Sequence, residues 1–401
     1  MLRPSFLEGT LMNTLRLKKK EDRRIRRGHP WVFSNELEPG ISGISPGELV
    51  LLEEHSGKPL GVGYANPHSL IAVRLIGRAG EEVGPALFRE RILNARTLRE
   101  RFCPGRDVYR AVYSESDFLP GLIVDRYSRW LSVQVLTAGM ERMLPFVMDA
   151  LEEVYRPDGI VLRNDSVQRT HEGLSLEKKV AKGECAGPVD IDINGTRLKV
   201  DLLEGQKTGF FLDQVDNYGL LDKIAEGADM LDLFCYIGAW ALAGLKAGAK
   251  SALCVDSSGP ALSAAEENFR LNGFEGRSEF VRDDAFSALK KIIDSGRRFG
   301  VVVADPPAFV KSRAKLAEGL KGYRDLNVKA MRTVSPGGFL ISCSCSHHVD
   351  RETFREMLMA GAAGSGRAVR LIEMRTQSKD HPVLLAAPET EYLKCALLQV
   401  M

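Results

Sequence analysis

The sequence predicts an α/β protein whose C-terminal half is a mostly parallel sheet covered by helices on both faces, with a small β domain and an α+β middle domain before it. From about residue 200, strand-like apolar runs alternate with helical stretches, which is typical of parallel sheets. Short strands separated by glycines precede residue 80, and strands mix with helices in between. We therefore expect domains over residues 1–83, 84–198 and 199–401.

Composition limits the class of protein. The chain has 401 residues, of which 44% are hydrophobic and 27% charged, as in ordinary globular proteins. No apolar run approaches the roughly 20 residues of a membrane helix, and the N-terminus lacks the apolar core of a secretion signal. Seven scattered cysteines indicate reduced thiols rather than a disulfide framework. We expect a cytoplasmic protein that does not contact membranes.

The N-terminal domain begins with a basic cluster. Strands are expected within residues 47–54, 58–67 and 71–76, after the segment "RLKKKEDRRIRR". Such a cluster can neutralise phosphates of RNA, and a solvated helix face is the open alternative. The residues that we expect to contact RNA are Lys19, Arg23 and Arg27.

The middle domain carries no chemical motif. Its expected elements are helices over 85–102 and 141–155, and strands over 109–116, 121–137 and 159–164, the second of these folded at 127–129. A hairpin over 189–202 is predicted to turn at Asn194-Gly195, because this dipeptide favours the positive φ angles of a two-residue hairpin loop.

Seven strands are expected in the C-terminal domain: 228–235, 251–258, 278–285, 299–308, 337–346, 368–377 and 393–400. The helical stretches between them include 259–273 and 322–334. Ligands of parallel α/β sheets bind beyond the carboxyl ends of the strands. The residues at those ends are therefore the candidates for a site.

Acidic residues stand at the ends of the first three strands. Asp232 lies late in the first strand, before Gly238 at a helix start, and Asp256 ends the second, where an acid can bind ribose hydroxyls. Asp283 and Asp284 follow the third strand and could accept from an adenine amine. The sequence lacks both G-x-G-x-x-G and a P-loop, which argues against an NAD-linked oxidoreductase. We expect an adenosine ligand without phosphate.

The fourth strand ends in "ADPPAF". Asp305 is presented at the strand exit, and Pro306 and Pro307 fix the backbone without donating N–H groups. A planar base could be bound there, with Phe309 stacking on it.

These segments together resemble a known family. They are similar to motifs of the class I S-adenosylmethionine-dependent RNA methyltransferases. The segments are "LDLFCYIGAW", "VDSS", "DDAF", "DPPAF", "GYRDLN", "SCSHH", "GQKTGFFLDQ" and "PETEYLK". The most similar group is the large-subunit ribosomal RNA cytosine-C5 methyltransferases with an N-terminal PUA domain. The resemblance implies a seven-stranded Rossmann-like catalytic domain, S-adenosylmethionine as cofactor and 23S ribosomal RNA as substrate. The first eleven residues resemble nothing in the family, which raises Met12 as an alternative start to Met1.

The resemblance also implies roles for particular residues. Asp232, Phe234 and Gly238 would contact the cofactor, Asp256 its ribose and Asp284 its adenine. A loop of Gln206, Lys207 and Thr208 would close over the cofactor. Asp305 would contact both the cofactor and the substrate base, with Pro306, Pro307 and Phe309 on the substrate side.

The stretch "GGFLISCSCSHH" is compatible with a metal site, a buried strand end or a cysteine nucleophile. A zinc site needs four converging ligands, and the alternation of a strand would point Cys343 and Cys345 one way and the adjacent histidines apart. We therefore expect no metal. Burial in the core is the alternative to a nucleophile. A thiolate that adds to C6 of cytosine would make C5 nucleophilic, and the family-like S-C-S pattern favours Cys345 over Cys343.

Several functional questions stay open at the level of sequence. His347 and His348 are candidates for the base that removes the C5 proton. Alternative functions are methylation of another ring position, such as guanine N7, without a cysteine, and non-catalytic RNA binding in ribosome assembly. The sequence does not distinguish a monomer from a homodimer, and it does not identify the modified nucleotide.

Overall fold

The computed structural model describes residues 12–185 and 187–401. The chain forms two compact units. The first comprises residues up to 189 together with 200–212 and 379–390, and the second comprises 190–199, 213–378 and 391–401. The alternative start at Met12 concerns residues 1–11, which lie outside the described residues. None of the helices in the described ranges is long and apolar enough to cross a membrane.

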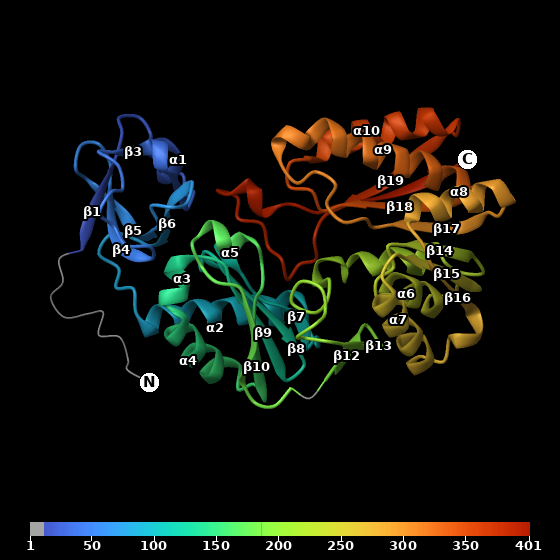
Figure 1. The fold of residues 1–401 in the computed structure, drawn as a ribbon, viewed down its shortest axis with the longest axis horizontal. Helices are drawn as coiled ribbons and strands as arrows, with labels where there is room; N and C mark the ends of the chain where they lie inside the picture. The colour runs from blue at the N-terminus through green and yellow to red at the C-terminus, as the bar shows by residue number, and fades with distance from the viewer. Residues whose placement is uncertain (1–11, 186) are drawn as a thin grey trace. The chain divides into compact units, whose positions relative to one another are not determined.

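The N-terminal part of the first unit is a six-stranded sheet (Figure 1). Its order is β2 (Trp31–Phe33), β6 (Ile71–Gly77), β5 (Pro59–Ala65), β4 (Glu48–Glu53), β1 (Asn13–Leu17) and β3 (Leu37–Glu38). The strands that the sequence predicted here are confirmed. Helix α1 (Asp22–Arg26) follows β1 and places Ile25 in the core while Arg23 and Arg26 are exposed.

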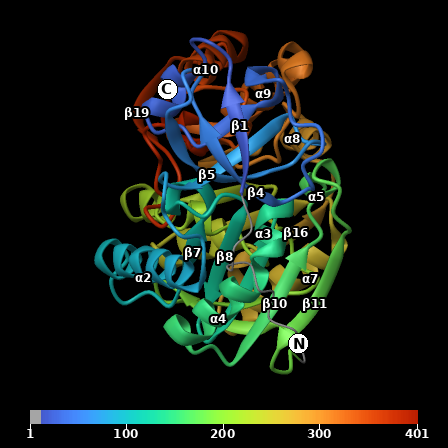
Figure 2. The ribbon, with the colours of Figure 1, turned by 90° about the vertical axis from the view of Figure 1, so that its left-hand side faces the viewer.

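A second sheet and four helices, two of which pack against each other, form the middle of the first unit (Figure 2). The strand order is β11 (Glu177–Lys182), β10 (Gly159–Asn164), β9 (Trp130–Val135), β8 (Leu122–Tyr127) and β7 (Val108–Tyr113). The helices are α2 (Pro85–Phe102), α3 (Ala138–Arg142), α4 (Leu144–Tyr155) and α5 (Gln168–His171). The predicted helix over 85–102 and the turn at 127–129 are confirmed, whereas the edge strand β11 was not predicted.

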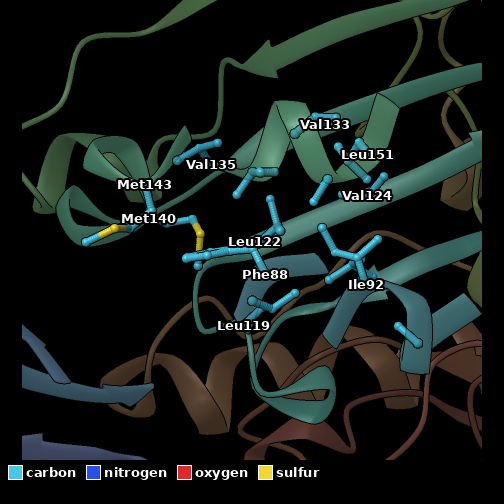
Figure 3. Packing of buried hydrophobic residues seen from close by; sticks show 14 of the residues in the cluster. Phe88, Ile92, Leu119, Leu122, Val124, Val133, Val135, Met140, Met143 and Leu151 are labelled. Carbon is cyan, nitrogen blue, oxygen red and sulfur yellow. The ribbon is translucent and has the colours of Figure 1, made fainter. Parts of the chain in front are cut away.

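The core of this part is made by alternation along the strands. Leu122 and Val124 of β8 point toward the face of the sheet on which Phe88 and Ile92 of α2 pack (Figure 3). The intervening residue Ile123 and its neighbour Asp125 point to the other side, as strand periodicity requires. One face of the sheet is therefore apolar under the helices, and the other face carries polar groups.

The predicted hairpin is confirmed. Strands β12 (Val189–Ile193) and β13 (Thr196–Val200) are joined by Asn194 at φ +53° and Gly195 at φ +77°. Two consecutive positive φ angles match the twist of the flanking strands.

The second unit contains the predicted mostly parallel, seven-stranded sheet. The order is β16 (Ser278–Arg282), β15 (Ser251–Asp256), β14 (Asp229–Leu233), β17 (Phe299–Ala304), β18 (Val334–Ser344), β20 (Lys394–Val400) and β19 (Val369–Arg375). Only β20 runs antiparallel to its neighbours. The order reverses between β14 and β17, so their carboxyl ends flank the place where such sheets bind ligands.

Helices cover both faces of this sheet (Figure 1). On one face lie α8 (Ala285–Ser295), α9 (Leu316–Thr333) and α10 (Arg351–Ser365), whose apolar residues share a core with the strands. On the other lie α6 (Ala239–Lys246) and α7 (Gly259–Leu271). The central strands β14, β15, β17 and β20 are thereby buried on both faces, which leaves their ends for polar chemistry.

Candidate active site

A buried carboxylate stands near the end of the first strand of the second unit. Asp232 on β14 is fully buried, and its Oδ2 accepts a hydrogen bond from the backbone N–H of Ala241 at 3.1 Å. Its Oδ1 has no hydrogen-bond partner among the described residues. Burial raises the pKa of this carboxyl well above its usual range, and the Ala241 N–H opposes that effect. A donor bound at Oδ1 would satisfy a costly buried acceptor.

The turn from β14 into α6 requires glycine. Phe234, Tyr236 and Gly238 all have positive φ, and Gly238 stands at +83° directly before the helix. A Cβ at position 238 would lie 2.7 Å from the ring of Phe269. Only glycine avoids both the strain and the clash, and its bare backbone also permits close approach of a ligand.

The next two acids are fixed by backbone N–H groups. Asp256 at the end of β15 accepts from Tyr236 N and Ser258 N, both at 2.9 Å. Asp284 caps helix α8 through Oδ1, which accepts from Phe286 N at 3.0 Å and Ser287 N at 3.2 Å. The helix-capping role of Asp284 uses one oxygen and leaves the second available to a ligand.

Asp305 follows β17 and is held by two side chains. Its Oδ2 accepts from Gln214 Nε2 at 3.0 Å and from Trp240 Nε1 at 3.1 Å. Asn217 donates to Gln214 Oε1 at 2.7 Å, which fixes the orientation of that amide. Trp240 in turn packs edge-on against Tyr218 at 4.8 Å between ring centroids. The carboxylate is therefore presented in one orientation.

The residues after Asp305 differ in their exposure. Pro306 is buried and Pro307 is exposed. Phe309 is half-buried, with its ring 4.7 Å from that of Tyr323 and 6.3 Å from that of Phe286. An aromatic group thus lies close to the Asp-Pro-Pro turn.

The two cysteines of the C-x-C pattern lie in different environments. Cys343 is fully buried in β18 opposite Cys395 of β20, and burial raises the pKa of its thiol well above the usual range. Cys345 is half-buried, and its Sγ lies 4.0 Å from the carbonyl oxygen of Pro306. Strand β18 ends at Ser344, so the alternation from which we expected both thiols to point one way does not extend to Cys345. Only Cys345 is partly accessible.

The backbone around Cys345 is clamped by its neighbours. Ser346 Oγ pairs with the hydroxyl of Tyr323 at 2.9 Å and accepts from Val310 N at 3.2 Å. Lys394 Nζ donates to the Ser346 carbonyl at 2.7 Å. Ser344 and Ser346 are buried on either side of Cys345. The thiol is therefore held on a rigid loop, as a reacting group requires.

The two histidines after Cys345 are exposed. The ring of His347 stacks on that of Tyr392 at 5.3 Å, and the Tyr392 hydroxyl donates to Asp213. His348 is exposed as well. Over residues 12–185 and 187–401, no group of three or more His, Cys, Asp or Glu side chains is arranged to hold a metal ion.

The predicted cofactor loop belongs to the first unit. Gln206 and Lys207 are exposed, and Lys207 Nζ lies 4.4 Å from the centre of the Phe211 ring. Thr208 is buried, and its hydroxyl donates to Asp125. The hydroxyl of Thr208 is thus engaged within its own unit.

The basic residues of the first unit fall into two groups. Arg24 Nη2 donates to both carboxylate oxygens of Glu36 at 2.8 Å, and Arg26 pairs with Asp22 and Glu54. The residues that we expected to contact RNA, in contrast, are exposed and form no ion pair with any described residue: Lys19, Arg23 and Arg27. Their charges remain available to a polyanion.

Four side chains at this site were not assigned from the sequence: Gln214, Trp240, Tyr323 and Lys394. All four lie in segments that carried the family resemblance: "GQKTGFFLDQ", "LDLFCYIGAW", "GYRDLN" and "PETEYLK". The signal was present, but nothing in the sequence indicated which group each side chain would contact.

Comparison with known proteins identifies two families along the chain. Residues 15–78 match a PUA-like domain, and residues 168–387 match the S-adenosylmethionine-dependent methyltransferases. A protein of Cronobacter sakazakii named ribosomal RNA large subunit methyltransferase I is 36% identical over 96% of this chain and 98% of its own length. The protein of the same name from Vibrio vulnificus is 37% identical over 94% of this chain and 97% of its own.

Solved structures share the fold. A Streptococcus mutans protein assigned to the SAM-dependent methyltransferases is 20% identical, with a TM-score of 0.84 over 97% of this chain and all of its own. A protein assigned as a methyltransferase and complexed with SAH has a TM-score of 0.86 at 20% identity, over the same 97% of this chain and 100% of its own. The Rossmann-like fold expected from the sequence is confirmed.

Proposed function

Because this chain belongs to the family of ribosomal RNA large subunit methyltransferase I, we propose that it makes 5-methylcytosine in 23S ribosomal RNA through a covalent adduct between Cys345 and the base. The observation that carries the proposal is the position of Cys345. Its half-buried Sγ lies 4.0 Å from the carbonyl oxygen of Pro306, the residue that follows Asp305. A thiol and a carboxylate are thus offered by adjacent strand ends.

The residues at the carboxyl ends of β14, β15 and β16 fit S-adenosylmethionine. The unpartnered Oδ1 of Asp232 is suited to the donors of an α-ammonium group, and the bare backbone of Gly238 permits close approach of a ligand. Asp256 would accept from the ribose hydroxyls and Asp284 from the adenine amine, with Phe234 at the same turn. The bound cofactor supplies an electrophilic methyl group carried on a sulfonium.

The thiol of Cys345 would make the ring reactive. Its thiolate forms a bond to C6, and the electron pair of the C5–C6 double bond moves to C5, which becomes nucleophilic. Once C5 carries the methyl group, a base removes the C5 proton. The electron pair of that C–H bond re-forms the double bond, and the sulfur leaves C6 as thiolate.

Asp305 would orient the base for this addition. Its Oδ2 is held by Gln214 and Trp240, so the carboxyl group can bind the N3 and amine edge of cytosine in one orientation. Pro306 and Pro307 keep the strand exit rigid, and Phe309 offers a ring for stacking. The loop of Gln206, Lys207 and Thr208 is proposed to close over the cofactor.

The PUA-like domain would supply affinity for ribosomal RNA. Lys19, Arg23 and Arg27 are exposed without an ion-pair partner among the described residues, so they can neutralise phosphates without breaking an existing pair. We place this activity in the cytoplasm, where ribosomal RNA is modified.

Bisulfite mapping of ribosomal RNA tests the proposal. Cells lacking the gene are complemented with the wild-type protein, with Cys345→Ala or with Cys343→Ala, and calorimetry of each purified protein with S-adenosylmethionine checks that the cofactor site is folded. We expect one protected cytosine in 23S RNA with wild type and with Cys343→Ala, and none with Cys345→Ala. A fully modified cytosine with Cys345→Ala, or a modified guanine in place of a cytosine, would overturn the covalent mechanism. Wild-type protein that leaves ribosomal RNA unmodified would favour a non-catalytic role.

A further inference from the structure

A buried lysine lies beside the loop of Cys345. Lys394 begins β20 opposite Ser344 of β18, and only 4% of it is exposed. Its Nζ donates to the carbonyl oxygens of Ser346 and Tyr392, each at 2.7 Å. Burial lowers the pKa of this amine to about 8, while the charge of Cys345 nearby opposes the shift. A buried lysine normally has a carboxylate partner, and none of the described carboxylates lies within ion-pair distance of Nζ.

The carbonyl contacts leave one position on the nitrogen. An ammonium group has three N–H bonds, of which two point to the carbonyls of Ser346 and Tyr392. The third N–H is available for an anion. Because one of the carbonyls belongs to Ser346, the residue directly after Cys345, the ammonium is tied to the loop that carries the thiol.

Other charged groups that act on Lys394 are already engaged. The charges of Asp350 and Glu391 also raise the pKa of the Lys394 amine, each by less than the charge of Cys345. Asp350 caps helix α10 through a bond from Thr353 N at 2.8 Å, and Glu391 pairs with Arg351 at 3.3 Å. The Tyr323 hydroxyl also faces this loop and pairs with Ser346 Oγ. Cys345 is therefore the candidate anion for the third N–H, because the carbonyl of its neighbour Ser346 binds the same nitrogen.

We propose that Lys394 is a positioning residue that anchors the Cys345 loop through the Ser346 carbonyl and keeps the Cys345 sulfur in its thiolate form by pairing with it as an ammonium. The consequence for catalysis rests on the proposed function, because a thiolate matters only if Cys345 attacks the base. The ion pair itself does not rest on it. A thiolate that is already formed needs no separate base to begin the addition to C6.

Alkylation by iodoacetamide across a pH range tests the pairing without RNA or cofactor. The extent of reaction at each cysteine of the full-length protein is read by mass spectrometry, and the midpoint of the rate against pH reports the thiolate. Cys185, half-buried in the first unit, is the internal reference. We expect the midpoint of Cys345 to lie about one pH unit below that of Cys185, the usual effect of a neighbouring opposite charge. A midpoint equal to or above that of Cys185 overturns the proposal, and this arm needs no variant.

Two substitutions separate charge from packing. Lys394→Met should raise the Cys345 midpoint by about one pH unit and slow its alkylation at neutral pH about tenfold, and Lys394→Arg should restore most of the rate. Tyr323→Phe removes another clamp on the same loop without changing charge, so it should leave the midpoint in place. A Lys394→Met midpoint equal to wild type would refute the pairing.

The pairing of Lys394 with Cys345 and the methylation of cytosine are tested by separate experiments, so either can fail without the other. If alkylation depends on Lys394 but bisulfite mapping shows no cytosine methylation, the ion pair stands and the proposed reaction falls. If methylation requires Cys345 but its alkylation midpoint ignores Lys394, the reaction stands and the role of Lys394 falls.

Discussion

Replacing Asp232 by asparagine should weaken S-adenosylmethionine binding while leaving the protein folded. The substitution keeps the shape and an oxygen for the Ala241 N–H, which Asp232 now accepts at 3.1 Å. It places an amide donor, instead of an acceptor, at the Oδ1 position that has no partner among the described residues. A buried neutral amide costs less desolvation than a buried carboxylate, so the fold should tolerate the change.

The expected loss follows from the kind of bond removed. A hydrogen bond to a charged group contributes about 1.5–3 kcal/mol, which corresponds to a loss of affinity of about 10- to 150-fold. The dependence on pH gives a second signature. Burial raises the pKa of Asp232, and an ammonium ligand needs the ionised carboxylate, so wild-type affinity should rise as pH increases through that raised pKa. The asparagine variant should lack this rise.

Isothermal titration calorimetry from acidic to neutral pH measures both effects. Asp229→Asn is the matched control, because Asp229 lies at the opposite end of the same strand, exposed and bonded to Ser251 at 2.5 Å. Its affinity should equal that of wild type. If Asp232→Asn also binds S-adenosylmethionine with wild-type affinity and pH dependence, Asp232 does not contact the cofactor, and the reasoning from its unpartnered oxygen is refuted.

Three further outcomes follow from the same geometry. Gly238→Ala should lower the free energy of unfolding by about 2–4 kcal/mol in urea denaturation, because it combines positive φ with a contact of 2.7 Å to Phe269; a change below about 0.5 kcal/mol would contradict this. Gln214→Leu should lower kcat about tenfold in a methyl-transfer assay by removing a donor to Asp305, whereas unchanged kcat would show that this bond does not orient the base. Combined substitution of Lys19, Arg23 and Arg27 by alanine should reduce the slope of log affinity for RNA against log salt by about 2–3, and Arg26→Ala, which breaks existing ion pairs, should change the slope less.

Local signals predicted much of the fold. The Asn194-Gly195 turn and the helix over 85–102 were predicted because turn chemistry and helical periodicity are encoded in neighbouring residues. Strand β11 was missed because "EKKVAK" is mostly charged and carries only one half-buried apolar side chain, Val180. Charged residues of this kind are common on edge strands, where they look like a loop in the sequence.

The candidate site was partly predictable for the same physical reason. Acids that end parallel strands share one edge of the sheet, so Asp232, Asp256 and Asp305 could be placed there from the strand pattern alone. The contacts of Gln214 and Lys394 could not, because their partners lie 91 and 48 residues away along the chain. The difference between Cys343 and Cys345 also depended on where β18 ends, and strand ends are poorly defined by sequence.

The sequence did not indicate that segments from one half of the chain belong to the compact unit formed mainly by the other half. We expected one continuous domain over 199–401, and the division into three domains stays a prediction. Residues 200–212 and 379–390 belong to the first compact unit, while 190–199 belong to the second. In the first unit the carboxylate of Asp380 accepts from Arg110 N at 2.7 Å, a contact across 270 residues. Periodicity within a segment carries no information about such a distant partner.

The covalent step itself is tested most directly with an RNA fragment of 23S that carries 5-fluorocytosine. Fluorine at C5 cannot leave as a proton does, so an enzyme that attacks C6 is trapped on the RNA after methyl transfer. We expect a complex that survives denaturation and a peptide in which Cys345 bears the modified nucleotide, with the same complex formed by Cys343→Ala and none by Cys345→Ala. Efficient methylation without a trapped species, or a nucleotide attached to another residue, would contradict the account.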